Sequence, residues 1–264
     1  MLLAIALGVA VGLILALTGA GGGILAVPFL MFGLHWDITQ AAPVALLAVA
    51  ASAALGALIG LRQRAVRYRA AALIAIVGGL LTPLGVYVAH AVPTQPLTLT
   101  FAGVLLYVAV RTFRRATSRP SDPDNPGAST VCVINPESGR FAWNAACARA
   151  LLATGALVGF LSGLLGVGGG FVLVPALKRS TDLPLHSIVA TSLLVIALVS
   201  LTAVATTALA GKLDFSVGLP FVAGALAGML SGRAIAGRLS ESRTQQGFAL
   251  ISGIVAIGLI ATSF

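Results

Sequence analysis

Charged side chains are scarce in this sequence, and acidic ones are the scarcest. Only 9% of its 264 residues are Asp, Glu, Lys or Arg, whereas ordinary soluble domains carry roughly 25%. Hydrophobic residues make up 58% of the chain, and its mean hydropathy is +1.05. So few charges cannot keep the surface of a soluble domain wetted. The composition therefore excludes an ordinary soluble protein and indicates one that is embedded in a lipid bilayer.

Cysteine and histidine are also rare, which removes most metal sites and disulfide frameworks. Cys132 and Cys147 have no histidine close by, so we interpret them as two inert thiols rather than a zinc site or a disulfide. The three histidines are too scattered to form a metal site. The phosphate loop, the dinucleotide fingerprint, the G-x-S-x-G elbow and the H-E-x-x-H pair are all missing. We therefore expect no enzyme, no metal and no cofactor.

Long apolar runs recur along the chain, and a helix needs about 20 such residues to cross a bilayer. These runs are continuous rather than alternating, which argues against a β-barrel. Met1–Leu17 lacks the basic start and the cleavage site of a secretory signal, so we count it as part of the fold. The predicted fold class is an all-α polytopic membrane protein. The further expected spans are Ala41–Leu61, Ala70–Val92, Pro96–Val110, His186–Ala210, Phe215–Gly237 and Gly247–Phe264.

Glycine is abundant, and two of its clusters are alike. The pattern G-x-G-G-G-x-x-x-V-P occurs in Thr18–Pro28 ("TGAGGGILAVP") and again in Leu165–Pro175 ("LGVGGGFVLVP"), at an offset of 147 residues. The same offset aligns further residues along both halves without a gap, which indicates an internal duplication. We therefore predict a first transmembrane repeat (1–110), a linker (111–147) and a second transmembrane repeat (148–264).

The linker contains the longest polar stretch of the chain. After several arginines it continues as "SRPSDPDNPGAST", a composition typical of a flexible loop. The next residues place "NPESG" between "VCVI" and "RFAW", which resembles a small β-hairpin. This hairpin either docks on the membrane domain or acts as a spacer, and we favour the spacer.

The basic residues indicate how the two repeats are related, because short cytoplasmic loops are enriched in Lys and Arg. Four simple spans per repeat would make the repeats parallel and place 11 of the 16 basic residues in the cytoplasm. If each glycine cluster instead breaks a helical hairpin that is followed by three spans, the second repeat is inverted. In that arrangement 15 basic residues are cytoplasmic, all except Lys212. We therefore predict two inverted repeats, a cytoplasmic linker and periplasmic termini.

The glycine clusters are also the predicted binding site. A helix that begins just after Gly23 or Gly170 directs unpaired N–H groups and the positive end of its dipole into the protein, and such ends bind anions. The alternative is that the glycines only permit close helix packing. Nearby hydroxyls could assist, although many bond only their own backbone. The candidate substrate-binding residues are Thr18, Gly19, Gly21, Gly22, Gly23, Ser162, Gly166, Gly168, Gly169, Gly170, Thr191, Ser192 and Arg233.

The charge pattern favours an anion as the substrate. The apolar segments contain no acidic residue, whereas carriers coupled to cations usually hold a carboxylate at depth. Arg233 either pairs with the anion in a cavity or extends to the cytoplasmic surface. The net charge of +9 comes from the ends of the apolar segments, so the expected partners are the bilayer and a small anion, not nucleic acid. The sequence leaves open whether the chain forms a homodimer.

Together these motifs resemble the TauE/SafE sulfite exporter family, also called the 4-toluene sulfonate uptake permease family. The resemblance rests on the doubled glycine pattern, on "VATSLL" after the second cluster, and on "GKLDF" followed by "GALAGMLSGRAIAGRL". It implies transport of sulfite or organosulfonates across the bacterial inner membrane. With the inverted repeats, it predicts alternating access around a central anion. Two other functions stay open, namely a channel-like anion pathway and a membrane receptor or scaffold that acts through the linker.

Overall fold

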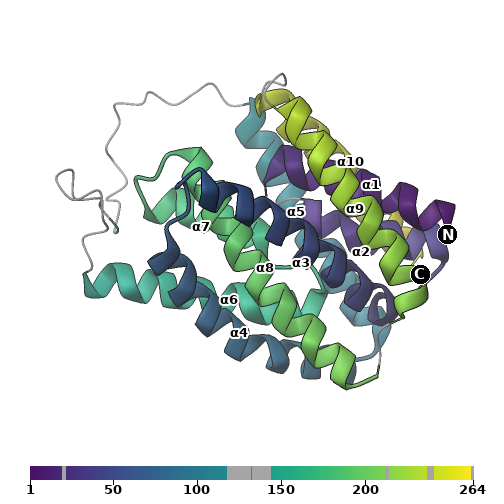
Figure 1. Cartoon of the computed structure of the whole chain (residues 1–264). Helices are drawn as coiled ribbons and strands as arrows, with labels where there is room; N and C mark the ends of the chain where they lie inside the picture. The colour runs from purple at the N-terminus through teal and green to yellow at the C-terminus, as the bar shows by residue number, and fades with distance from the viewer. Residues whose placement is uncertain (20–21, 118–131, 133–143, 212–213, 237–240, 263–264) are drawn as a thin grey trace.

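The computed structural model of the chain describes residues 1–19, 22–117, 132, 144–211, 214–236 and 241–262, and these residues form ten helices and no strand beyond an isolated β-bridge (Figure 1). Seven of the ten helices are long and apolar enough to cross a membrane. The all-α polytopic fold class is therefore confirmed. The helices are α1 (Leu2–Thr18), α2 (Gly22–Leu34), α3 (Ile38–Arg62), α4 (Tyr68–Ala91), α5 (Thr94–Thr117), α6 (Ala145–Leu165), α7 (Gly170–Ser180), α8 (Leu185–Leu209), α9 (Phe215–Ala236) and α10 (Glu241–Thr262).

The two glycine clusters end one helix and start the next. Helix α1 stops at Gly19 and helix α6 stops at Gly166, with φ angles of 75° and 72°. Glycine adopts this left-handed conformation without a steric penalty, and it commonly terminates helices in this way. The N–H of each glycine donates to the carbonyl four residues earlier, which closes the last helical turn. Helices α2 and α7 then begin at Gly22 and Gly170.

Each glycine-broken segment folds back on itself. In the first, Gly22 lies against Leu15 and Gly33 lies against Leu7, so α2 runs antiparallel to α1. In the second, the start of α7 lies against α6. The far end of α7 is linked to the start of α6 by Cys132, which bridges to Thr181 and is bonded to Cys147. Helices α1 and α2 are short apolar helices, whereas α6 is long enough by itself to cross a membrane. The second hairpin therefore has one long arm and one short arm.

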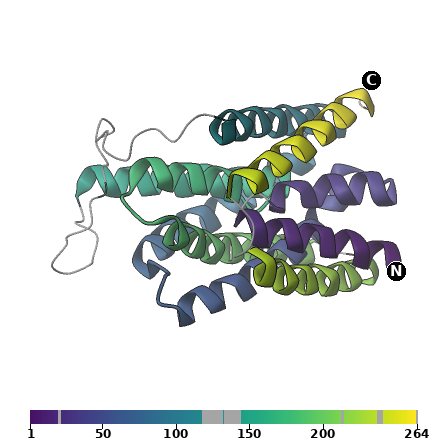
Figure 2. The same cartoon turned by 90° about the horizontal axis from the view of Figure 1, so that it is seen from above.

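The helices pair in a pattern that is consistent between the two halves. Helix α1 packs most closely on α9, and α6 packs most closely on α4. At the 147-residue offset α1 corresponds to α6 and α9 corresponds to α4, so these two pairs are equivalent. The other close pairs join α3 to α8 and α5 to α10, and each unites corresponding helices. The N-terminus and the end of α10 lie at the same end of the molecule in both views (Figure 1 and Figure 2).

Glycines outside the clusters allow these close pairs. A Cβ atom on Gly12 would collide with the carbonyl oxygen of Ala225, and one on Gly228 would collide with that of Val9. Between α4 and α6, a Cβ atom on Gly159 would collide with the backbone of Gly78. Small residues spaced four apart let membrane helices approach closely. For these glycines, close packing is the role that the structure shows.

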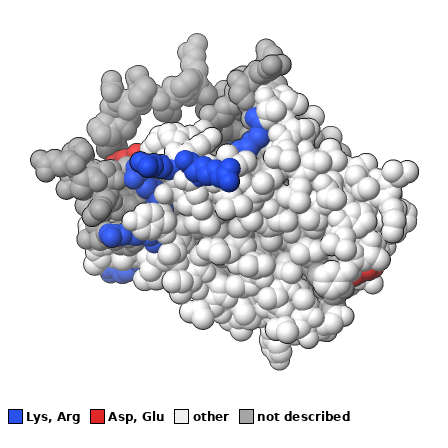
Figure 3. All heavy atoms as spheres, in the orientation of Figure 1, with Lys and Arg blue, Asp and Glu red and all other residues white. Residues whose placement is uncertain are grey.

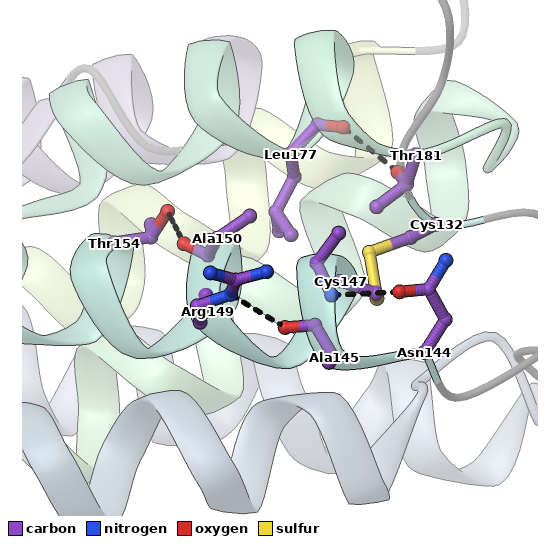
Figure 4. Close-up of a disulfide and its surroundings, with 10 residues drawn as sticks. Cys132, Asn144, Ala145, Cys147, Arg149, Ala150, Thr154, Leu177 and Thr181 are labelled. Atoms are coloured by element: carbon purple, nitrogen blue, oxygen red, sulfur yellow. Dashed lines mark hydrogen bonds between the residues drawn. A yellow bond between two sulfur atoms is a disulfide. The ribbon is translucent and has the colours of Figure 1, made fainter.

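The prediction of two inert thiols is wrong, because Cys132 and Cys147 form a disulfide with a Cα–Cα distance of 5.0 Å (Figure 4). The Cys132 N–H donates to the Ser180 carbonyl at 2.9 Å, beside an isolated bridge to Thr181. The disulfide therefore joins the end of α7 to the first turn of α6, with both cysteines buried. The two cysteines are 15 residues apart, and the backbone of Cys132 is held beside the end of α7. The predicted β-hairpin around "NPESG" lies in residues 133–143, outside the described part of the chain.

We expect the purified protein to hold these two sulfurs in an oxidised pair. Denatured protein should take up a maleimide–polyethylene glycol label only after reduction, and then at two positions. The double variant Cys132→Ser, Cys147→Ser should have a free energy of unfolding lower by about 3 kcal/mol, because closing a loop of this length restricts the unfolded chain. Chemical denaturation of oxidised wild type and of the variant measures this difference. Full labelling without a reductant would contradict the disulfide.

Candidate functional site

Helices α1 and α2 form the first hairpin, and α6 and α7 form the second. Their tips, the glycine-rich connections between the two helices of each hairpin, meet inside the protein. A Cβ atom on Gly23, in the first turn of α2, would lie 2.7 Å from the carbonyl oxygen of Val167, in the connection between α6 and α7. The side chain of Val49 on α3 borders both tips, since it lies near Gly23 and near Gly168. Gly23, Val49 and Val167 are all buried. The glycine clusters, far apart in the sequence, therefore form one buried junction.

Helices α3 and α8 hold the two tips in equivalent ways. Gly19 in the first tip lies against Val189 of α8, while Gly166 in the second tip lies against Ala42 of α3. Gly19 corresponds to Gly166 at the 147-residue offset, and Ala42 corresponds to Val189. Each hairpin tip therefore rests on a long helix of the other half.

Backbone conformation explains why glycine occupies the tips. Besides Gly19 and Gly166, Gly168 and Gly169 have φ angles of 74° and 67°, which L side chains rarely adopt. The Gly22 N–H donates to Thr18 Oγ1 at 3.2 Å, and Thr18 Oγ1 donates to the Ile14 carbonyl at 2.7 Å. The predicted residue Gly21 lies outside the described residues.

Several serine hydroxyls on the helices that form the junction are buried and have no hydrogen-bond partner among the described residues. Within the described part of the chain, Ser162 and Ser192, both predicted, have buried Oγ atoms that bond to nothing. The same is true of Ser200, whose Oγ lies 2.9 Å from the position of a Cβ on Gly168. A buried hydroxyl without a partner costs about 1–3 kcal/mol, and it calls for an explanation. A polar ligand between the tips would supply the missing partner.

Sequence reasoning missed Ser52 and Ser200, which lie within the long helices α3 and α8. Most hydroxyls in membrane helices bond to the carbonyl one turn earlier, as Thr206 and Thr207 do here. The sequence therefore gave no reason to single out these two serines. Their interruption of the two most apolar helices was the available signal.

Two of the predicted site residues, Thr191 and Arg233, form hydrogen bonds to other helices or their connections rather than to the hairpin tips. Thr191 Oγ1 accepts a hydrogen bond from the backbone N–H of Arg67 at 3.0 Å, which ties α8 to the connection between α3 and α4. Arg233 Nη1 donates to the Gly56 carbonyl on α3 at 3.2 Å. These contacts hold helices together, and neither joins the residue to a hairpin tip.

One cavity leads from the surface to the hairpin tips. It has a volume of about 130 Å³ and is lined by Thr18 and Gly170 at the tips, and by the exposed Lys178. No acidic side chain lines it among the described residues. Lys and Arg atoms gather at one end of the visible face (Figure 3). This cavity therefore extends from the exposed Lys178 to the start of α7.

A second cavity, of about 470 Å³, occupies the opposite ends of α5 and α10. Its lining residues Met31 and Thr98 correspond, at the 147-residue offset, to Lys178 and Gln245 in the first cavity. Leu259 and Thr112 correspond in the same way, so the two hollows have part of their lining at matching positions of the two halves. They differ in charge, because the acidic residue Asp37 borders the second one.

Comparison with known proteins gives consistent matches. The family model described as sulfite exporter TauE/SafE matches residues 4–259. The probable membrane transporter protein YunE of Bacillus subtilis (strain 168) is 28% identical over 238 residues, which cover 88% of this chain and 86% of the relative. A probable membrane transporter protein of Xylella fastidiosa (strain 9a5c) is 28% identical over 261 residues, covering 96% and 92%. No solved structure matches the chain.

Proposed function

The chain belongs to the sulfite exporter TauE/SafE family, and on that premise we propose that it is a secondary transporter that carries sulfite or an organosulfonate across the bacterial inner membrane. The observation that supports this most is the buried junction of the two hairpin tips. Helix starts meet there beside serine hydroxyls that have no partner among the described residues. An anion is the ligand that both features favour.

The proposed site holds the anion through backbone and hydroxyl donors. The starts of α2 and α7 direct N–H groups and positive dipole ends toward the junction. Ser162, Ser192 and Ser200 supply O–H groups. A sulfite or sulfonate spreads its charge over three oxygens, so it can accept several such hydrogen bonds at once. Binding by dipoles rather than by a full cation leaves the anion able to depart.

Transport would follow if the two hairpins alternate, so that first one cavity and then the other gives access to the site. The equivalent helix pairs and the matching cavities support two inverted repeats. In this conformation the cavity at Lys178 reaches Thr18 and Gly170, whereas the residues around the other cavity lie toward the opposite ends of α5 and α10. Closing the first route and opening the second would expose the same site to the other side. The excess of basic residues favours the cytoplasm for the Lys178 end.

Flux measurements in proteoliposomes test the proposal. Sulfite and 4-toluenesulfonate should enter at a saturable rate, and anion trapped inside should accelerate uptake by counterflow. A channel-like pathway would give flux without saturation or counterflow. A receptor or scaffold would give no flux of either anion, and deletion of residues 118–131 would then abolish its function. Empty liposomes and liposomes with heat-denatured protein are the controls.

A further inference from the structure

A third cavity, of about 350 Å³, lies between α5 and the second hairpin. Two arginines line it, Arg111 from α5 and Arg179 from α7. Most of its other lining is apolar and comes from both hairpin arms, including Leu157, Val172 and Pro175. The volume lies within the range of small-molecule sites. The cavity therefore combines two cationic heads with an apolar wall.

This cavity opens on the face that the protein presents to lipid. Tyr107 and Leu157, which line it, are 63% and 51% exposed. On α5, Val110 and Phe113 are also exposed large hydrophobic residues. Exposed apolar side chains along helices of spanning length are expected to face acyl chains. A ligand in this cavity can therefore keep its apolar part in the bilayer.

Among the described residues, no carboxylate pairs with either guanidinium group. In the part of the chain that the structure describes, neither Arg111 nor Arg179 forms an ion pair. Arg111 Nη1 donates only to the Tyr107 hydroxyl, at 3.4 Å, and its guanidinium lies 5.9 Å from that ring. Arginine presents a planar fork that binds phosphate through two hydrogen bonds. The cavity thus has unused capacity for a phosphate.

We propose that this cavity binds an anionic phospholipid of the leaflet that faces the basic end. The phosphate lies at Arg111 and Arg179, and the first part of an acyl chain lies along Val172 and Pro175. Basic pockets between membrane helices are typical sites for such head groups. The transported anion fits less well here, because most of the lining is apolar and the cavity that reaches Gly170 is a different one. The two cavities share Val108, Thr112, Phe171 and Pro175, so the lipid contacts the hairpin arm that begins at the proposed transport site.

Lipid retention measured by native mass spectrometry tests this site independently of transport. Detergent-purified protein is mixed with phosphatidylglycerol or with phosphatidylcholine of the same chain length. Wild type should retain phosphatidylglycerol preferentially. Arg111→Gln and Arg179→Gln should each lower its retention roughly fivefold, and the double variant should lower it further. Arg149→Gln is the matched control, because Arg149 is exposed near the same end of the molecule and lines no part of this cavity.

A second variant separates the cavity from general surface charge. Ala176→Phe keeps both arginines but fills the space next to them, so it should also lower retention of phosphatidylglycerol. Equal losses in Arg149→Gln and Arg179→Gln would overturn the proposal, since binding would then follow net charge alone. Unchanged retention in Ala176→Phe would overturn it too. If inorganic phosphate displaces the lipid completely, the site recognises free phosphate and the lipid assignment is wrong.

Discussion

Gly168→Ala should lower the flux of sulfite at least about tenfold, while the protein still folds. This loss corresponds to about 1.4 kcal/mol in the free energy of sulfite binding or in the free-energy barrier to its transport. Gly168 has a φ angle of 74°, and its new Cβ would lie 2.9 Å from Ser200 Oγ and 2.9 Å from a methyl group of Val49. The added carbon would occupy space at the proposed site and move the start of α7. Proteoliposome flux at several anion concentrations measures the effect.

Gly211→Ala separates backbone strain from loss of the site. Gly211 also has a positive φ angle, 67°, but a Cβ there would meet no atom within 4 Å. Both variants force alanine into the left-handed region, at a cost of about 1–2 kcal/mol. We expect normal flux in Gly211→Ala, and a larger loss of stability in Gly168→Ala, whose Cβ also crowds Ser200 and Val49. Equal flux in both variants would leave Gly168 as a residue needed only for the turn.

Local sequence features predicted the helices well. Apolar length predicted the spans, so that the expected segment Ala41–Leu61 lies within α3 and His186–Ala210 largely coincides with α8. The glycine clusters predicted where α1 and α6 stop, because a left-handed residue ends a helix whatever surrounds it. Such features depend on a few neighbouring residues, and the sequence contains all of them.

Features that depend on distant contacts were not predictable in the same way. Glycines spaced four apart in α1 and α6 indicate close packing, but only the fold decides that α9 and α4 are the partners. The hydroxyl of Ser200 has the same sequence context as many hydroxyls that bond their own helix. Cys132 meets Cys147 because a backbone bridge to Thr181 brings the linker back to α7. No periodicity in the sequence indicates the contact between Cys132 and the end of α7.

The redox state of Cys132 and Cys147 in growing cells would distinguish the two possible orientations of the protein in the membrane. The disulfide lies at the end of the second hairpin, where Arg149 and Arg179 are also found. The distribution of basic residues favours the cytoplasm for this end, whereas stable disulfides are characteristic of oxidising compartments. With the proposed orientation, the two thiols would be reduced in growing cells and would oxidise after lysis. A periplasmic linker would keep the pair oxidised in both conditions.

Removing the Ser200 hydroxyl should change stability and transport in opposite directions. In the described structure this buried hydroxyl has no hydrogen-bond partner, so Ser200→Ala should raise the free energy of unfolding by about 1 kcal/mol. A hydrogen bond to a charged ligand contributes about 1.5–3 kcal/mol, so the same variant should raise the KM for sulfite about tenfold or more. Denaturation in detergent and saturation curves in proteoliposomes measure the two effects.

Ser252→Ala is the matched control for this experiment. Ser252 is equally buried and unpartnered within the described residues, but it lies on α10, which packs on α5. Its loss should raise stability in the same way and leave the KM unchanged. A loss of stability in Ser200→Ala would mean that the hydroxyl has a partner within the protein. An unchanged KM would mean that the anion does not use it. Only a group reserved for the ligand combines a gain in stability with weaker transport, because a packing residue loses both together.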